Sequence, residues 1–143
     1  MVELFNPTRF LKAQEEHFAN AHAELKRGRK TSHWMWFIFP QMKGLGHSSL
    51  ANFYGISSRA EAEAYLRHPV LGQRLVDCTA LVNSIEGSSI EEIFGQTDAM
   101  KFRSCMTLFA EVDKRSQVFA AALQKYFHGL PDKLTLDLFN QAM

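Results

Sequence analysis

Apolar side chains recur every three or four residues along most of this chain, a spacing that predicts amphipathic helices. The first predicted helix begins at Asn6-Pro7, an N-cap followed by proline at the first helical position, and ends at Gly28. Its buried face is predicted to consist of Phe10, Gln14, Phe18, Ala21 and Leu25. The charged residues Lys12, Glu15, Glu16 and Glu24 are expected mostly off that face.

Local start and stop signals predict six further helices. Ser58 to Glu61 is a capping box that starts a helix through Tyr65 and Leu66, and Pro69 opens the next one. Ser89 to Glu92 is a second capping box, on a short helix closed by Gly95. Three more helices are predicted after it. The first is capped by Thr97, the second runs from Ser116 to His128, and the third starts at Thr135.

The segment from Trp34 to Phe39 is a continuous apolar run, which fits either a buried strand or two turns of buried helix. A loop follows, in which Gly44 and Gly46 permit positive φ or a close approach of the backbone to a ligand. Strand signals are almost absent elsewhere. We therefore predict an all-α fold, with residues 1–143 forming a single compact domain of about seven helices with short connections.

Composition narrows the classes of function. The 16 Lys and Arg nearly balance the 15 Asp and Glu, so no overall field attracts phosphate backbones and we do not expect nucleic-acid binding. The run Lys26–Lys30 fits a solvated helix end better than an anion site, and RNA binding there is the lesser alternative. Twelve Phe residues can build a dense core, in which Cys78 and Cys105 are expected as small buried residues.

The chain start does not resemble a signal peptide, and the longest apolar run is too short to span a membrane, so we expect a cytoplasmic protein without membrane contact. The standard nucleotide-binding loops are absent, as are His-Glu-x-x-His and Cys-x-x-Cys. We expect no metal site and no resident cofactor. The sequence leaves the oligomeric state open.

Polar and aromatic side chains are concentrated on both sides of the glycine-bearing loop. The candidate ligand-binding residues there are His33, Trp34, Trp36, Gln41, Asn52, Tyr54, Tyr65, His68 and Arg74. Rings offer stacking surfaces while amide and imidazole groups read hydrogen-bonding edges, which is typical of a pocket for a flat polar ligand such as a nucleobase. For the Trp pair taken alone, a place in the core with internally satisfied N–H groups is the favoured interpretation.

Two further groups are candidates. Asp98, Lys101 and Ser104 lie near the start of a predicted helix. One interpretation is that Asp98 and Lys101 form an ordinary surface ion pair. The other is that Lys101 and Ser104 face a polar cavity and are ligand-binding candidates. Glu61 is explained fully by its capping box, yet a carboxylate near aromatic walls could also serve as a general acid or base. The ligand hypothesis requires the side chains around the glycine loop to converge with those at the helix near position 100.

Several motifs resemble those of the domain of unknown function 1810 family. These are Ser32-His-Trp-Met-Trp-Phe-Ile-Phe-Pro-Gln41, Gly44-Leu-Gly-His-Ser48, Glu61-Ala-Glu-Ala-Tyr-Leu66, His68-Pro-Val-Leu-Gly-Gln-Arg-Leu75, Phe94-Gly95, Asp98-Ala-Met-Lys101 and Ser104-Cys-Met-Thr-Leu-Phe109. They cover nearly the whole chain. The resemblance implies a small all-helical domain and no established activity.

A fainter similarity links Leu50–Tyr54, Glu63-Ala-Tyr65 and Met100–Phe102 to motifs of the NADAR superfamily, although Ala64 and Val70 depart from that pattern. That superfamily acts on N-glycosidic bonds of ADP-ribose and riboflavin-pathway compounds. The resemblance implies a small-molecule, nucleotide- or ADP-ribose-like ligand and N-glycosidase chemistry, with Glu63 as the catalytic carboxylate. Glu61 is the alternative carboxylate, and Lys101 is a further catalytic candidate. The alternative is a non-enzymatic interaction or structural domain.

Overall fold

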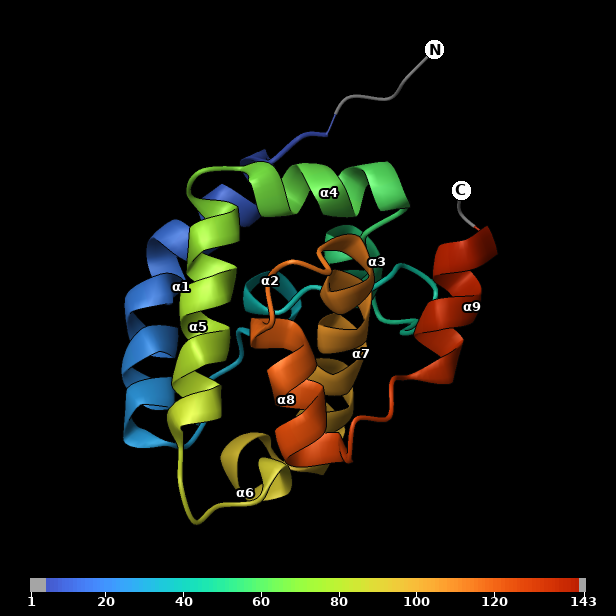
Figure 1. Ribbon diagram of the computed structural model, residues 1–143. Helices are drawn as coiled ribbons and strands as arrows, with labels where there is room; N and C mark the ends of the chain where they lie inside the picture. Colours follow the sequence, from blue (N-terminus) through green and yellow to red (C-terminus); the bar gives the residue numbers. More distant parts are fainter. Residues whose placement is uncertain (1–4, 142–143) are drawn as a thin grey trace.

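The computed structural model describes residues 5–141 of the chain, and helices are the dominant elements there (Figure 1). Along this part of the chain the nine helices are α1 (Thr8–Arg27), α2 (Met35–Ile38), α3 (Ser49–Tyr54), α4 (Arg59–Arg67), α5 (Leu71–Ser84), α6 (Ile90–Phe94), α7 (Gln96–Val112), α8 (Val118–Phe127) and α9 (Lys133–Gln141). The predicted all-α class is confirmed for these residues.

Helix ends with strong local signals lie close to where the sequence predicts them. Asn6 Oδ1 accepts the Thr8 N–H at 3.0 Å at the start of α1, and Gly28 ends this helix with a φ of 86°. Ser89 and Glu92 form the complete capping box of α6. These contacts are made within a few residues along the chain, so they depend little on the rest of the fold.

The predicted number of helices was too low because α3 was missed and residues 34–39, which contain α2, were left open between strand and helix. The segment after Trp34 is helical: the Ile38 N–H bonds the Trp34 carbonyl at 3.2 Å. Ser48, at the end of the glycine loop, caps α3 by accepting the Ala51 N–H at 3.1 Å. Neither helix exceeds six residues, too few for a periodic pattern to be read from the sequence.

Two predicted helix starts are also corrected. The helix predicted to begin at Thr97 starts one residue earlier, directly after Gly95 and without a side-chain cap. The helix predicted to begin at Thr135 starts at Lys133, and Asp132 caps it by accepting the Thr135 N–H at 3.1 Å.

Helix α7 lies at the centre of the arrangement, packed against α4, α6, α8 and α9. Figure 1 shows α4 across one end of the molecule and α6 at the other, with α1 and α5 side by side and α9 at the opposite edge. The core contains a chain of phenylalanines in which Phe102 contacts Phe39 at 5.1 Å and Phe94 at 4.9 Å between ring centroids.

Both cysteines belong to this core and are free thiols. Burial raises the pKa of the Cys78 thiol to about 12 and also raises the pKa of Cys105, so both stay protonated and unreactive near neutral pH. No helix within residues 5–141 combines the length and hydropathy required to cross a bilayer.

Candidate functional site

Two lysines share one carboxylate where the segment after α1 meets the first turns of α7. Asp98 accepts from Lys30 Nζ at 2.8 Å and from Lys101 Nζ at 3.3 Å. The Lys30 side chain is only 8% exposed and its ammonium also donates to the Ser32 carbonyl at 2.5 Å, whereas Lys101 is 25% exposed. Lys30 is therefore locked in place, and Lys101 is the cation that solvent and ligands can reach.

Each of these lysines lies over an indole ring. Lys101 Nζ is 4.9 Å from the ring centroid of Trp36, on α2, and Lys30 Nζ is 5.1 Å from that of Trp34. The ring faces carry partial negative charge, which holds the ammonium groups there. We call Lys30, Trp36, Asp98 and Lys101 the Lys30–Lys101 cluster. Trp36 and Lys30, which precede the glycine loop, thus meet the head of α7. The predicted convergence is met only in part, because Glu61, Tyr65 and Arg74, which follow the loop, make their contacts elsewhere in the fold.

Trp34 itself belongs to the core. It is 1% exposed and its indole N–H donates to Glu24 Oε1 at 3.0 Å. The favoured interpretation of this tryptophan as a core residue is confirmed, and its ring has no open face on which a base could stack. Trp36 is only half-buried.

Glu24 is the residue here that the sequence interpretation missed, since it was expected off the buried face of α1. It is 3% exposed because residues 31–34 fold back over the last turns of that helix. Its carboxylate accepts from the N–H groups of Thr31 and Ser32, at 2.6 and 2.9 Å, and from Ser32 Oγ at 2.6 Å, besides Trp34. Burial acts to raise the pKa of Glu24, but these hydrogen bonds outweigh it and hold the pKa at about 2.

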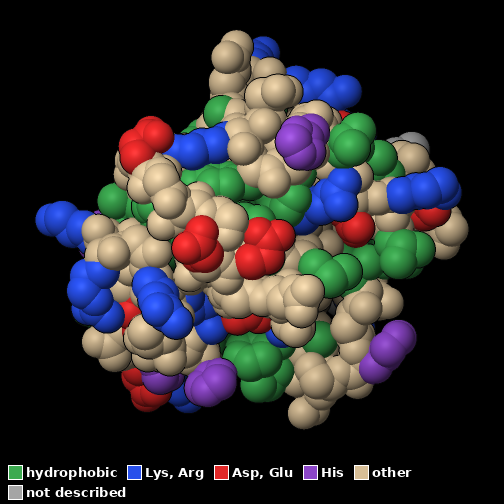
Figure 2. All heavy atoms as spheres, turned by 90° about the horizontal axis from the view of Figure 1, so that it is seen from below, with side chains coloured by type: hydrophobic (Ala, Val, Ile, Leu, Met, Phe, Trp, Pro, Cys, Tyr) green, Lys and Arg blue, Asp and Glu red, His purple; other side chains and the backbone are tan. Residues whose placement is uncertain are grey.

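A surface groove of about 270 Å³ lies next to the cluster and is lined by Arg29, Lys30 and the α6 segment from Glu91 to Gly95. The backbone fixes its edge, because the Lys30 N–H donates to the Ile93 carbonyl at 2.7 Å. Figure 2 views the α6 end of the molecule, where acidic side chains lie near the middle of the face and basic side chains lie on several sides around them. The groove therefore presents both signs of charge.

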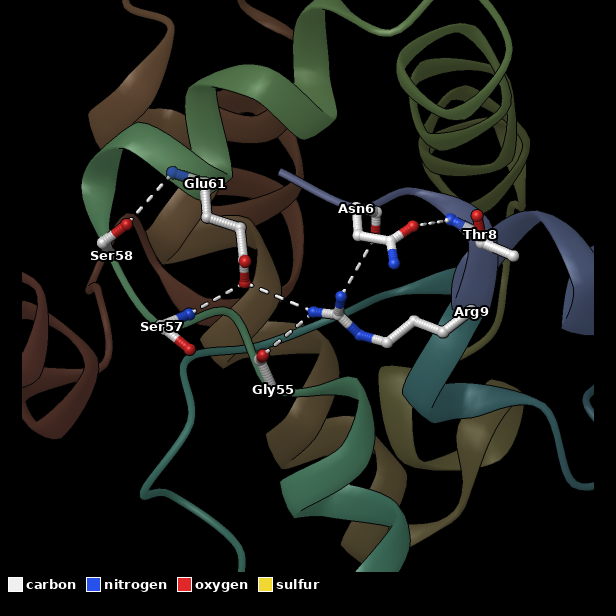
Figure 3. Close-up of polar contacts among 7 residues, drawn as sticks. All are labelled: Asn6, Thr8, Arg9, Gly55, Ser57, Ser58 and Glu61. Carbon is white, nitrogen blue, oxygen red and sulfur yellow. Dashed lines mark hydrogen bonds and ion pairs between the residues drawn. The ribbon is translucent and has the colours of Figure 1, made fainter. Parts of the chain in front are cut away.

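Glu61 lies elsewhere, at the start of α4 (Figure 3). Its Oε1 accepts from Arg9 Nη2 at 3.3 Å and from the Ser57 N–H at 3.0 Å, while Ser58 Oγ accepts the Glu61 N–H at 3.1 Å. The predicted capping box is thus half formed, because the carboxylate reaches Ser57 instead of Ser58. Glu61 links α4 to α1 through Arg9.

Glu63 lies on another side of α4, since two residues correspond to about 200° of helical rotation. It pairs with Arg59 at 2.9 Å and more loosely with Arg67 at 4.0 Å. Together with Asp113 it lines a groove of about 320 Å³ between α4 and the end of α7. The two carboxylates that the sequence offers as alternatives therefore face different surroundings.

Tyr65 and Arg74 take part in a polar contact inside the protein. The buried amide of Gln14 donates to the Phe37 carbonyl at 2.7 Å and to the Tyr65 hydroxyl at 3.3 Å, and accepts from Arg74 Nη1 at 3.2 Å. Tyr65 is 0% exposed and burial raises its pKa, so its ring has no face free for stacking. The Arg74 guanidinium packs over Phe18, 4.6 Å from the ring centroid.

Two other predicted ligand residues contribute to helix starts, His68 as a cap and Ser104 through a contact with a capping residue. His68 Nδ1 accepts the N–H groups of Val70 and Leu71, both at 3.2 Å, at the start of α5. Ser104 Oγ is buried 3.3 Å from Asp132 Oδ2, the carboxylate that caps α9. Both contacts stabilise the joints between helices.

The remaining candidates lie on the surface or around the glycine loop. His33 and Asn52 are exposed, and Gln41 is half-buried with its carbonyl bonded to the Ile56 N–H at 2.9 Å. Tyr54, on α3, packs against Phe10 and Phe37. Residues 5–141 contain no group of three or more His, Cys, Asp and Glu residues placed to hold a metal ion.

Comparison with known proteins gives the chain its family. The model described as "Protein of unknown function (DUF1810)" matches residues 4–139. The chain belongs to the DUF1810 family. A similar solved structure is the crystal structure of the conserved hypothetical protein Rv1873 from Mycobacterium tuberculosis, 51% identical over 95% of this chain and 97% of that one, with a TM-score of 0.94. No curated protein gives a significant match, and neither description names a ligand or an activity.

Proposed function

We propose that this DUF1810 protein binds a small nucleotide-like ligand that carries phosphate, at the Lys30–Lys101 cluster. The observation that carries the proposal is the position of the Lys101 ammonium, 4.9 Å from the ring centroid of the half-buried Trp36. A flat base can stack on an exposed indole face, while an ammonium group attracts phosphate oxygens. One small surface presents both groups.

The charge of the cluster also favours an anion. Two lysines share the single carboxylate of Asp98, which leaves one positive charge in excess among these three groups. The ionised carboxylate of Glu24 is 3% exposed and is held by hydrogen bonds from Thr31, Ser32 and Trp34, so it does not compete with a ligand for contact with Lys101. The neighbouring groove adds no further excess of charge, since Glu91 and Glu92 line it together with Arg29 and Lys30.

Nucleotide titration monitored by calorimetry tests this proposal, with adenosine, AMP, NAD and ADP-ribose as ligands. Lys101→Gln removes the accessible charge and is expected to weaken AMP binding by roughly tenfold, the effect of losing one charge-assisted contact. Lys114→Gln is the matched control, since Lys114 is exposed and follows the far end of α7, which ends at Val112, whereas Asp98 and Lys101 lie in its first turns. A folded wild-type protein that binds none of the four nucleotides contradicts the proposal.

A second candidate function is hydrolysis of an N-glycosidic bond at the groove beside α4. It is favoured by Glu63 and Asp113, which line the same groove. Glycoside hydrolysis commonly uses two carboxylates, one to stabilise an oxocarbenium-like centre and one to handle the proton of water or of the leaving group. The faint NADAR similarity of Glu63-Ala-Tyr65 points to the same residue.

Release of free base from NAD, ADP-ribose derivatives and riboflavin-pathway nucleotides measures this second function. Glu63→Gln is expected to abolish the release, whereas Glu86→Gln serves as a control because Glu86 is 88% exposed. If release occurs but survives Glu63→Gln, the groove beside α4 is not the site. If no release occurs while calorimetry shows binding, the protein binds such ligands without hydrolysing them.

A further inference from the structure

A third groove, of about 290 Å³, lies between α1, α2 and α3 and has no part in the proposed nucleotide site. Its lining from α1 includes Arg9, Lys12 and Glu16, which recur at helical spacing on a side of this helix other than the core face. Helix α2 separates the two sites: Trp36 contacts Lys101, while its neighbour Phe37 lines this groove.

The opposite wall of the groove is aromatic. Tyr54 lies 5.3 Å from Phe37 and 4.8 Å from Phe53 between ring centroids, the latter pair edge to face. Phe53 is 57% exposed, a large apolar surface to leave in water on a six-residue helix. A flat ring inserted here would be in contact with aromatic side chains and would remove part of the Phe53 surface from water.

The charges near the aromatic wall are not equal in effect. Arg9 is 20% exposed at its side chain and lies close over the Phe10 ring, whereas the side chain of Glu16 is 76% exposed. Burial raises the pKa of Tyr54, and among the nearby charges Arg9 acts on this phenol more strongly than Glu16 does. Among the lysine, arginine and acidic residues that line the groove, Arg9 and Lys12 outnumber Glu16.

The guanidinium group of Arg9 is held in place by hydrogen bonds, but one of its nitrogen atoms has no hydrogen-bond acceptor in the described part of the chain. Its Nη atoms donate to the carbonyls of Asn6 and Gly55 and to Glu61, as Figure 3 shows. Its Nε is buried without a hydrogen-bond partner in the described structure. Lys12, one turn further along α1, is exposed and makes no ion pair within residues 5–141.

We infer that this groove is a second binding site, for a planar aromatic ring that carries one anionic group. The ring lies against Phe37, Phe53 and Tyr54, and the anionic group is directed to Lys12 at the α1 edge, within the field of Arg9. The volume is close to the lower end for small-molecule pockets, which suits a ligand of one or two fused rings.

Nuclear magnetic resonance titration with a matched set of ligands tests this inference: 1-naphthoate as the anion, 1-naphthalenemethanol as the neutral analogue and 1-naphthylmethylamine as the cation. We expect 1-naphthoate to bind most tightly and to shift the amide signals of Lys12, Phe53 and Tyr54. The amide signals of Asp98 and Lys101 are expected to stay unchanged, which separates this groove from the nucleotide site.

Two variants assign the contributions of ring and charge. Phe53→Ser is expected to weaken 1-naphthoate binding by roughly tenfold, with Leu50→Ser, at an exposed position of the same helix, as its control. Lys12→Gln is expected to weaken only the anion, by roughly two- to fivefold, as for other exposed charge pairs.

Equal binding of the anion, the neutral analogue and the cation would overturn the charge assignment. Shifts that map away from α1 and α3, or an affinity that Phe53→Ser leaves unchanged, would overturn the site. Either result leaves the nucleotide proposal intact, because that proposal rests on different residues.

Discussion

The indole N–H of Trp34 and the carboxylate of Glu24 form a buried pair, 3.0 Å apart, that fastens the segment after α1 onto the end of that helix. The same carboxylate accepts from Thr31 and Ser32, so one side chain organises the backbone that leads to Trp36. The position of the Lys30–Lys101 cluster thus depends on a carboxylate that does not belong to it.

Glu24→Gln is expected to lower the free energy of unfolding by about 2–3 kcal/mol, because an amide replaces a charged acceptor and directs its own N–H groups at donors. Urea unfolding monitored by circular dichroism measures the change. Glu15→Gln, an exposed position on the same helix, is the control and should alter stability by less than about 0.5 kcal/mol. Equal effects of the two substitutions would show that Glu24 does not organise this segment.

The same carboxylate predicts a pH dependence of stability. Its pKa is about 2 in the folded protein against an ordinary value of 4.5, so folding favours the ionised form. The stabilisation is complete above the unfolded pKa and is lost as the pH falls from about 5 through the folded value. The shift corresponds to about 3 kcal/mol. Urea unfolding between pH 3 and pH 7 measures the change. As the pH is lowered, the free energy of unfolding should fall less for Glu24→Gln than for the wild type. If it falls equally for both proteins, Glu24 is not the source of the pH dependence.

The sequence predicts the long helices well, because caps such as the Ser89–Glu92 box and the Gly28 terminus are made by neighbouring residues. It leaves α2 undecided between helix and strand and misses α3, since such short helices are stabilised mainly by packing against other elements. The burial of Glu24 was missed for a similar reason. Periodicity along α1 cannot show that the chain turns back after Gly28 and covers this residue.

The candidate site was predicted in part. A meeting of Trp36 with Lys101 follows from the expected convergence of two polar regions. The sequence does not show that Tyr65 lies beneath the surface or that Glu61 pairs with Arg9, because these facts depend on how α4 packs against α1. A polar residue close to an aromatic segment can therefore hold two helices together as readily as it can bind a ligand.

The Arg9–Glu61 pair joins α1 to α4 at 3.3 Å, with both side chains about one-fifth exposed. A double-mutant cycle with Arg9→Met and Glu61→Gln should give a coupling of about 1 kcal/mol, since the pair is partly shielded from solvent. The Arg59–Glu63 pair, more exposed and within one helix, is the comparison and should couple by about 0.3–0.5 kcal/mol. A larger coupling for the exposed pair would contradict the role assigned to Glu61.

Gly72, in the first turn of α5, is required by the approach of α4. A Cβ atom at this position would lie 1.9 Å from the carbonyl oxygen of Leu66, a backbone atom that can move only if the joint between α4 and α5 opens. Gly72→Ala should therefore destabilise the protein by more than about 3 kcal/mol, despite the higher helix propensity of alanine. Gly87→Ala is the comparison, because Gly87 has a φ of 79° and no atom lies within 4 Å of a Cβ placed there.

Only the backbone strain of this positive φ opposes Gly87→Ala, so thermal unfolding should show a loss of stability of about 1 kcal/mol. If the two variants unfold at the same temperature, the close packing at Gly72 does not constrain the angle between α4 and α5.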